Sequence, residues 1–367
     1  MTLWATSAVL ARAPAAADDR PPGATVEADL EGITGPVDLV LRLSRPGLAE
    51  TVAPNATREG TLPDAAAQHA TVAAAEAQQR SVARAAAGVG ATKIGSLSRS
   101  LNGVVVHADA AAIPALAALP GVTEVLRVPS YQTSWPRETP VPSDSLAQAA
   151  RALDIDRMRD QNLTGEGMRV AVIDSGIDFT HANLGGPGTP HAYTECYGRP
   201  PGAGVAEDAS QPRNVAPTGA CAALFGGPDN KVIGGYDFVG ESWPDGPVAP
   251  DPNPIDFEGH GTHVADILAG ASADGAHLGL APKAKLYALK ACSARTTSCN
   301  GAAVLAAIDW ALDPDGDGNM NDAVDVINMS FGSLYGQPEG AGTLAVANAV
   351  RAGVVVAVAA GNDGNKP

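Results

Sequence analysis

The residues that could do chemistry are an aspartate and a histidine, each placed where a regular element meets a turn. Asp174 ends the apolar segment MRVAVID (168–174), and Gly176 after it permits a sharp turn. His260 lies in EGHGTHVADILAG, where the chain enters an expected helix. A carboxylate at the end of a buried strand costs free energy unless another group pairs with it. A histidine oriented by such a carboxylate is a general base that can activate a nucleophile.

Structural roles remain open for the same residues. Asp174 could be a turn residue or a helix N-cap, which is a common use of aspartate. His263 follows His260 by three positions, whereas the zinc-protease signature has two histidines four apart with a glutamate after the first, and Gly261 occupies that place here. We therefore expect no zinc site, and we expect His263 to be a satisfied packing histidine.

The second half of the chain alternates short apolar strands with helices. The expected strands are MRVAVID (168–174), KLYALKAC (285–292), DVINMSF (325–331) and VVVAVAAG (354–361), and the expected helices cover 261–271, 301–313 and 344–353. Short, wholly apolar strands separated by helices predict an α/β fold, a parallel sheet with helices on both faces. Active residues in such sheets lie at the carboxyl ends of the strands, where Asp174 stands.

The first half divides into three parts. Residues 1–35 are polar and rich in Pro and Gly, so we expect a signal-like or disordered N-terminus. Residues 36–129 predict a small α+β domain, with strands at 37–43, 100–108 and 123–128 and helices at 65–87 and 110–122. Residues 130–145 contain three prolines and predict an exposed linker, after which 146–367 form the larger domain.

Composition excludes some partners. The formal net charge of -16 disfavours nucleic acid, because like charges repel. No apolar run reaches the roughly 18 residues that span a bilayer, so we expect no membrane segment here. The start, MTLWATSAVLARAPAAADDR, is similar to the end of a signal peptide without its basic region, and an Ala-rich disordered end is equally open.

The four cysteines lie in loop-like surroundings and include no C-x-x-C pair. They are Cys196, Cys221, Cys292 and Cys299. An even number in loops favours two disulfides paired nearest with nearest, although four cysteines allow three connectivities and four reduced thiols are the alternative. Bridged cysteines predict a secreted, extracellular protein.

Three motifs in order, VAVIDSGID, GHGTHVA and AAGNDG, resemble the subtilisin-like serine proteases, or subtilases, over residues of about 145–367. The order of Asp before His agrees with the subtilisin type. The resemblance implies a secreted endopeptidase acting on polypeptides, with Asp174 and His260 in its catalytic triad. It also implies that Asn362 donates to the oxyanion.

Two further segments extend the resemblance. VINMSFG is similar to the substrate-binding strand of the family, which implies that Ser330, Phe331 and Gly332 pair with the substrate backbone and that Ser330 is not the nucleophile. SLNGVVVHADAAAIPALAALPGVTEVLRV looks like the end of the family's inhibitor propeptide. It implies that the chain's own propeptide is an intramolecular inhibitor, that its tail fills the cleft, and that processing occurs within 130–145.

The segment LDPDGDGNMNDAVD suggests a calcium loop. Oxygen-bearing residues alternate along it, as calcium loops require, with Gly318 at the turn but Val324 where an EF-hand carries its glutamate: Asp313, Asp315, Asp317, Asn319 and Asn321. Calcium is the expected cofactor, and an acidic solvated turn is the alternative.

The nucleophile has no candidate in the sequence. Subtilases carry it in a Gly-Thr-Ser-Met-Ala stretch after the oxyanion asparagine, and the 367 residues contain no such stretch. We therefore expect the N-terminal part of a secreted zymogen endopeptidase, cut short at Pro367 and inactive by itself. A catalytically dead pseudoprotease, or an inhibitor or binding module, is the alternative.

Overall fold

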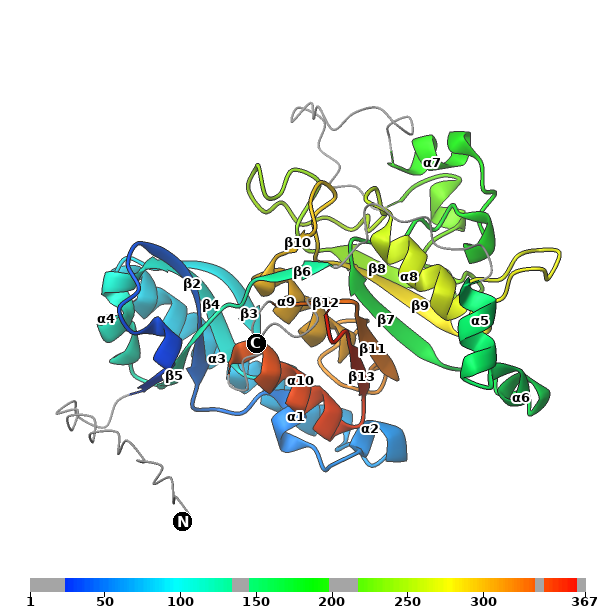
Figure 1. Ribbon diagram of the computed structural model, residues 1–367. Coiled ribbons are helices and arrows are strands. Elements are labelled where there is room, and N and C mark those ends of the chain that lie inside the picture. Colours follow the sequence, from blue (N-terminus) through cyan, green and yellow to red (C-terminus); the bar gives the residue numbers. More distant parts are fainter. Residues whose placement is uncertain (1–23, 134–144, 198–216, 334–339, 362–367) are drawn as a thin grey trace, which may run out of the picture.

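The computed structural model describes residues 24–133, 145–197, 217–333 and 340–361. Two sheets flank a central pair of helices, α9 (Gly301–Ala311) and α10 (Ala341–Ala352), which pack against both (Figure 1). The helices therefore belong to one shared core that joins the two halves of the chain.

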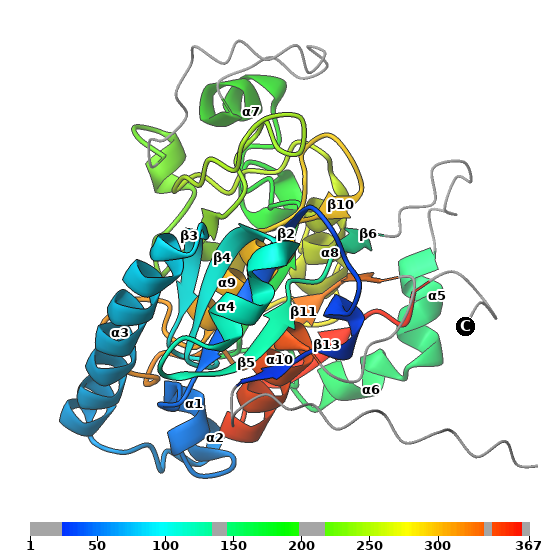
Figure 2. The same ribbon diagram turned by 90° about the vertical axis from the view of Figure 1, so that its left-hand side faces the viewer.

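The N-terminal sheet contains five strands. Their order is β1 (Thr25–Val26), β5 (Val122–Arg127), β2 (Pro36–Leu43), β4 (Gly103–Asp109) and β3 (Thr92–Leu97). All pairs are antiparallel except β1 with β5. The helices α3 (Ala65–Gly88) and α4 (Ile113–Ala117) cover its outer face (Figure 2).

The alternation along β2 explains why this sheet is covered on both faces. Leu39 and Leu41 pack with α3 and α4, while Val40 between them packs in the core that contains α9 and α10. Successive side chains of a strand point to opposite faces, so an uninterrupted apolar run needs two covers.

Part of the N-terminal 35 residues is ordered, contrary to our expectation for that segment. β1 lies there, and the Glu27 carboxylate accepts a 2.6 Å hydrogen bond from the Arg127 backbone N–H. A two-residue strand carries no periodic signal, so it becomes visible only through its partner β5. The edge strand β3 was also missed, because its side chains are mostly exposed.

The main sheet has five parallel strands. Their order is β13 (Val355–Val358), β11 (Val326–Met329), β7 (Arg169–Asp174), β9 (Lys285–Lys290) and β8 (Val232–Asp237). In β7, Val170 and Val172 face the core of α8 (His260–Ala269), while Ala171 and Ile173 face that of α9 and α10. The predicted α/β fold with helices on both faces is confirmed.

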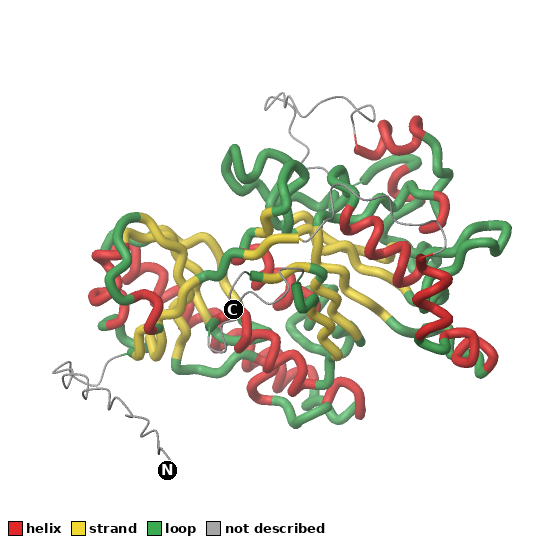
Figure 3. Tube along the Cα trace, in the orientation of Figure 1, coloured by secondary structure: helices red, strands yellow, loops and turns green. Residues whose placement is uncertain are grey.

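A third, small sheet lies between the other two. Its antiparallel order is β10 (Ser298–Cys299), β6 (Tyr131–Thr133) and β12 (Phe331–Gly332), seen in Figure 3 as the short strands at the centre. The prediction of an exposed linker was therefore wrong for residues 131–133. Three residues show no period of their own, and they are extended here because strands on either side pair with them.

The other described elements are short. They are the helices α1 (Leu48–Thr51), α2 (Ala56–Glu59), α5 (Ser145–Ala152), α6 (Ile155–Asp160) and α7 (Pro190–Tyr197), and the 3-10 turns η1 (Ala28–Leu30), η2 (Ala110–Ala112), η3 (Ala182–Leu184) and η4 (Cys221–Ala223). Among the described helices, none combines the length and the apolar character needed to cross a membrane.

Both disulfides join nearest cysteines, as predicted. Cys196 is bonded to Cys221, and Cys292 to Cys299. No free cysteine remains, because all four residues take part in these bridges.

Candidate active site

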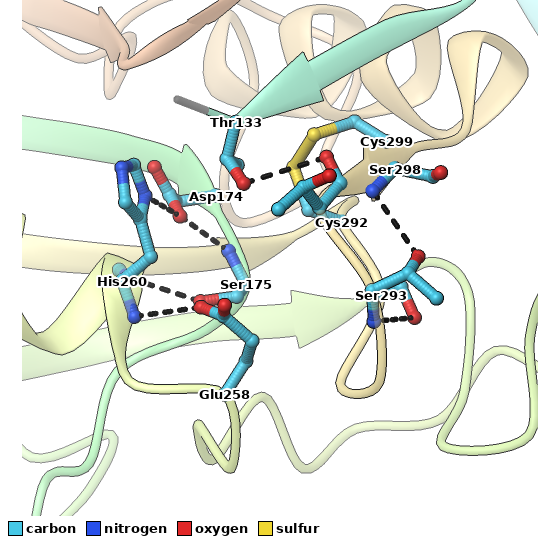
Figure 4. Close-up of a disulfide and its surroundings, with 12 residues drawn as sticks. Thr133, Asp174, Ser175, Glu258, His260, Cys292, Ser293, Ser298 and Cys299 are labelled. Atoms are coloured by element: carbon cyan, nitrogen blue, oxygen red, sulfur yellow. Dashed lines mark hydrogen bonds and ion pairs between the residues drawn. A yellow bond between two sulfur atoms is a disulfide. The ribbon is translucent and has the colours of Figure 1, made fainter. Parts of the chain in front are cut away.

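His260 and Asp174 meet at the carboxyl edge of the main sheet (Figure 4). The Asp174 side chain is fully buried, and its Oδ1 lies 2.7 Å from His260 Nδ1. The same oxygen accepts a 2.7 Å hydrogen bond from the Ser175 backbone N–H. This contact fixes the carboxylate, so the imidazole has a defined orientation.

Glycines allow the two segments to come this close. A Cβ on Gly261 would lie 2.1 Å from the carbonyl oxygen of Gly176 and 3.1 Å from the Asp174 Cβ. Gly176 itself has a φ of +111°, and a Cβ there would lie 2.5 Å from the Pro254 carbonyl oxygen. Larger residues at 176 or 261 would push α8 away from the end of β7.

The first turn of α8 is held by Asp256. Its carboxylate accepts hydrogen bonds from the Gly259 N–H at 3.0 Å, the Thr262 N–H at 3.0 Å and the Thr262 hydroxyl at 2.6 Å. Helix N-termini leave such N–H groups without intrahelical partners. The Glu258 carboxylate accepts a 2.9 Å hydrogen bond from the His260 backbone N–H, so the His260 backbone is held in place as well.

The electrostatic surroundings favour the charged imidazole. Burial by itself lowers the pKa of His260, but the hydrogen bond with Asp174 and the charges of Asp174, Glu258 and Asp256 outweigh it, so the pKa is raised. Burial raises the pKa of Asp256 to about 6, against the opposing effect of its hydrogen bonds. The site thus stabilises an imidazolium, the state that a general base reaches after taking a proton.

Residues 131–133 form the middle strand between β10 and β12, and Thr133 is seen near Asp174 in Figure 4. Thr133 donates its backbone N–H to the Thr297 carbonyl at 2.7 Å, on the β10 side. On the other side, Phe331 lies opposite Thr133 and Gly332 opposite Gln132. Phe331 and Gly332 therefore pair with an extended segment of the chain itself, and their pairing with a substrate stays a prediction.

Ser330 lies one residue before that strand. Its hydroxyl accepts a 2.9 Å hydrogen bond from the Asn328 side-chain amide. Asn362 lies outside the described residues.

Tyr131 packs, partly buried, against the apolar core that contains α9 and α10. Its ring lies 5.3 Å from that of Phe331, and a Cβ on Gly342 would come within 2.3 Å of the Tyr131 hydroxyl oxygen. Burial raises the pKa of Tyr131 to about 12. The Tyr131 ring can lie this close to α10 because Gly342 has no side chain.

The acidic loop brings three of its predicted ligands together. Carboxylate oxygens of Asp313, Asp315 and Asp317 lie within 4.8 Å of one another. The Asn319 side-chain amide donates to Asp317, and its oxygen accepts from the Asn321 backbone N–H at 2.8 Å, so these two residues brace the loop.

Sequence reasoning missed a fourth carboxylate beside this loop. Asp322 accepts from the Asp315 N–H at 2.8 Å, and burial with the charges of Asp315 and Asp313 raises its pKa to about 6. Asp313 Oδ1 and Asp322 Oδ1 are buried without a hydrogen-bond partner among the described groups. Such oxygen donors fit a hard cation such as calcium.

His263 differs from our expectation of a packing histidine. It is exposed and lines a cavity of about 350 Å³ with Asp178, His181 and Asp266. His263 lies one helical turn after His260, on a neighbouring part of the α8 surface, and it contributes to this cavity and not to the core.

Comparison with known proteins identifies the family. The model of the subtilase family matches residues 165–367. The chain belongs to the subtilase family.

Curated subtilases of plants and bacteria are among its relatives. Subtilisin-like protease SBT2.1 of Arabidopsis thaliana is 32% identical over 225 residues, 55% of this chain and 24% of that protein. Subtilisin E of Bacillus subtilis (strain 168) is 31% identical over 211 residues, 57% of this chain and 38% of that protein. The chain thus spans less than two fifths of the length of either relative.

Among solved structures, fervidolysin from Fervidobacterium pennivorans aligns with a TM-score of 0.49 and 16% identity. The alignment covers 95% of this chain and 43% of that one. As a family, the subtilases are serine endopeptidases that act on polypeptides.

Several residues of this subtilase site gave little signal in the sequence. Asp256 stands four positions before His260, where an N-terminal capping residue could have been inferred. Ser175 lies within the motif VAVIDSGID, but nothing there indicates that its hydroxyl accepts from the Gly261 N–H at 2.9 Å. Thr297, whose carbonyl accepts from the Thr133 N–H, belongs to no motif. Their roles depend on contacts between segments far apart in the sequence.

Proposed function

We propose that this subtilase is an exported serine endopeptidase made as a zymogen, with Asp174 and His260 as two members of its triad. The observation that carries the proposal is the buried 2.7 Å contact between His260 Nδ1 and Asp174 Oδ1, next to a cleft that already pairs with an extended chain. A base, its orienting carboxylate and a peptide-binding strand are what peptide hydrolysis requires of this part of the fold.

The reaction proceeds through an acyl-enzyme. With Nδ1–H donating to Asp174, the other imidazole nitrogen of His260 accepts the serine hydroxyl proton as the serine oxygen bonds to the scissile carbonyl carbon. The same proton passes to the amine that leaves as the C–N bond breaks, and water then repeats the sequence on the ester. Asn362 donates its side-chain N–H to the oxyanion. The serine belongs to a Gly-Thr-Ser stretch, which the printed sequence does not contain.

The N-terminal sheet acts as the inhibitory propeptide. One support is its docking on the helices of the protease half, where Asp309 accepts from the backbone N–H groups of Ser98, Arg99 and Ser100 at 3.0, 2.9 and 2.6 Å. A second support is the position of residues 131–133, which run between β10 and β12 and exclude any other chain from that part of the cleft. Processing then falls within 130–145.

Calcium binding by the acidic loop is part of the same proposal. Asp313, Asp315, Asp317 and Asp322 would hold the ion, and the two buried carboxylate oxygens without hydrogen-bond partners support this assignment. The ion would neutralise the loop between α9 and β11 and thereby stabilise the fold. Two disulfides among the described cysteines support export to an oxidising compartment.

The test uses the protein expressed from its complete reading frame, as wild type and as His260→Ala. Casein hydrolysis is measured, together with the appearance of a new N-terminus between residues 130 and 145. Wild-type activity that the substitution abolishes would support the proposal. Processing and hydrolysis that survive His260→Ala, or a folded wild type without activity, would overturn it and favour a binding or inhibitor module.

A further inference from the structure

We propose that the Cys292–Cys299 disulfide positions the cleft strand β10 relative to the Asp174–His260 pair, and thereby sets where a bound chain lies. Figure 4 shows the bridge close to Thr133, with Asp174 and then His260 farther from it. This inference rests on the proposed function in one respect only, that the cleft holds a polypeptide.

One end of the bridge is fixed to the strand that carries the catalytic carboxylate. The Asp174 carbonyl oxygen accepts hydrogen bonds from the Ala291 N–H at 2.9 Å and from the Cys292 N–H at 3.0 Å. Cys292 is 1% exposed and stands two residues after the end of β9, the neighbour of β7 in the main sheet. The backbone of Cys292 therefore has a fixed position relative to Asp174.

The other end of the bridge lies in residues 297–299, which border the segment 131–133 and are called the wall of the cleft below. Cys299 belongs to β10 and stands opposite Tyr131, the residue of the bound segment that packs against the core of α9 and α10. Two residues before it, the Thr297 carbonyl accepts the Thr133 N–H at 2.7 Å. A displacement of this wall would move the bound backbone with it.

The loop that carries β10 is restrained mainly at its Cys292 end, where the Ser293 hydroxyl donates to the Trp243 carbonyl at 2.9 Å and accepts from the Arg295 N–H at 2.9 Å. β10 has two residues and forms an edge of the small sheet, and among the described strands it pairs with the bound segment β6 alone, while Cys299 also forms an isolated antiparallel bridge with Cys292. Backbone hydrogen bonds from Ser293 to Ser298 and from Asn300 to Ala291 close the hairpin, each at 2.9 Å. Because so short a strand is marginal alone, the covalent bond between Cys292 and Cys299 adds a restraint on β10 beyond these hydrogen bonds.

The second disulfide provides a matched control. Cys196 and Cys221 join α7 to η4 and pack in the core that contains α8. Neither residue belongs to the three strands of the cleft. Removing this bridge also deletes a disulfide, but it leaves the wall of the cleft tied to Asp174.

The test is hydrogen exchange of this chain followed by mass spectrometry. We compare wild type, Cys292→Ala/Cys299→Ala and Cys196→Ala/Cys221→Ala, using alanine so that no hydroxyl is buried. In the first variant, peptides covering 129–133 and 293–299 should exchange about tenfold faster or more, because local opening is no longer restrained. Peptides from β7 and α8 should remain as in wild type, and the control should leave 129–133 unchanged.

The outcomes separate the two proposals. A protected wild-type segment that responds equally to both double variants would overturn the positioning role alone. A wild-type segment 129–133 that exchanges like an unstructured peptide would overturn both the occupied cleft and this inference. Should the alanine pair not fold, Cys292→Val/Cys299→Ala restores apolar volume. If that variant also fails while the control folds, the bridge is a folding requirement and the positioning role is wrong.

Discussion

Substitution of Asp309 tests how the N-terminal sheet is held on the protease half. The carboxylate is buried in α9 and accepts four hydrogen bonds, from the backbone N–H groups of Ser98, Arg99 and Ser100 and from the Ser100 hydroxyl at 2.7 Å. Removing it leaves three N–H groups without an acceptor, and each buried unsatisfied group costs about 1–3 kcal/mol. Some of them will reach water, so we expect Asp309→Ala to lower the free energy of unfolding by about 3–5 kcal/mol.

A graded series makes this prediction sharper. Asp309→Asn keeps one acceptor oxygen but turns an N–H toward another donor, so it should cost less than alanine. Asn348 donates to the Ser100 carbonyl at 2.9 Å in the same interface, and Asn348→Ala removes one neutral hydrogen bond worth about 1 kcal/mol.

Urea unfolding at pH 7 gives the free energies, and hydrogen exchange of residues 98–100 shows where the structure opens. The reasoning is refuted if Asp309→Ala costs no more than Asn348→Ala. It is also refuted if residues 98–100 keep their protection in the Asp309→Ala variant.

Three other predictions concern the cleft, the base and the acidic loop. Asp174→Asn in the complete enzyme should lower kcat by roughly 10⁴-fold. The Asp174 charge contributes to the raised pKa of His260, so this pKa should fall in the variant. The rising limb of the pH–rate profile, where neutral imidazole forms, should therefore move to lower pH. Tyr131→Ala removes a ring that packs against the core of α9 and α10 and should make residues 129–133 exchange faster, whereas Tyr131→Phe should leave their exchange close to wild type; equal effects of both would contradict this packing role. A chelator should lower the Tm of wild type and not that of Asp313→Asn, and an unchanged wild-type Tm would count against calcium.

The contact between Asp174 and His260 and the main fold could be predicted because their signals are local. β7 is an apolar run that ends in Asp174, and a strand end in a parallel sheet is where such a residue must lie. Two glycines near Asp174 and His260, Gly176 and Gly261, are the sequence feature that permits the close approach of α8 to the end of β7. The disulfide pairing followed from even number and loop surroundings.

The remaining parts could not be predicted because they depend on distant partners. β6 has three residues and no period, and it is extended only because β10 and β12, more than 160 positions away, pair with it. Asp309 lies within an expected helix, and nothing in that segment indicates that its carboxylate accepts hydrogen bonds from the backbone N–H groups of residues 98–100. Likewise, the exposure of His263 depends on which side of α8 faces the sheet.

The arrangement of the cleft has a consequence for activation under the proposed function. A cut after residue 133, within 130–145, would leave residues 131–133 attached to the N-terminal sheet. That sheet remains docked through Asp309 and through Arg351, whose guanidinium donates to the Val52 carbonyl at 2.8 Å. A tethered segment rebinds at an effective concentration of about millimolar for a short linker. Peptide-bond cleavage alone would therefore not open the cleft, and release would require the N-terminal sheet to undock or be degraded. An Asp309→Ala enzyme should for this reason reach full activity sooner after processing than wild type. Processing itself depends on His260 and should proceed at an unchanged rate. An equal delay between processing and full activity in both enzymes would mean that docking does not limit release.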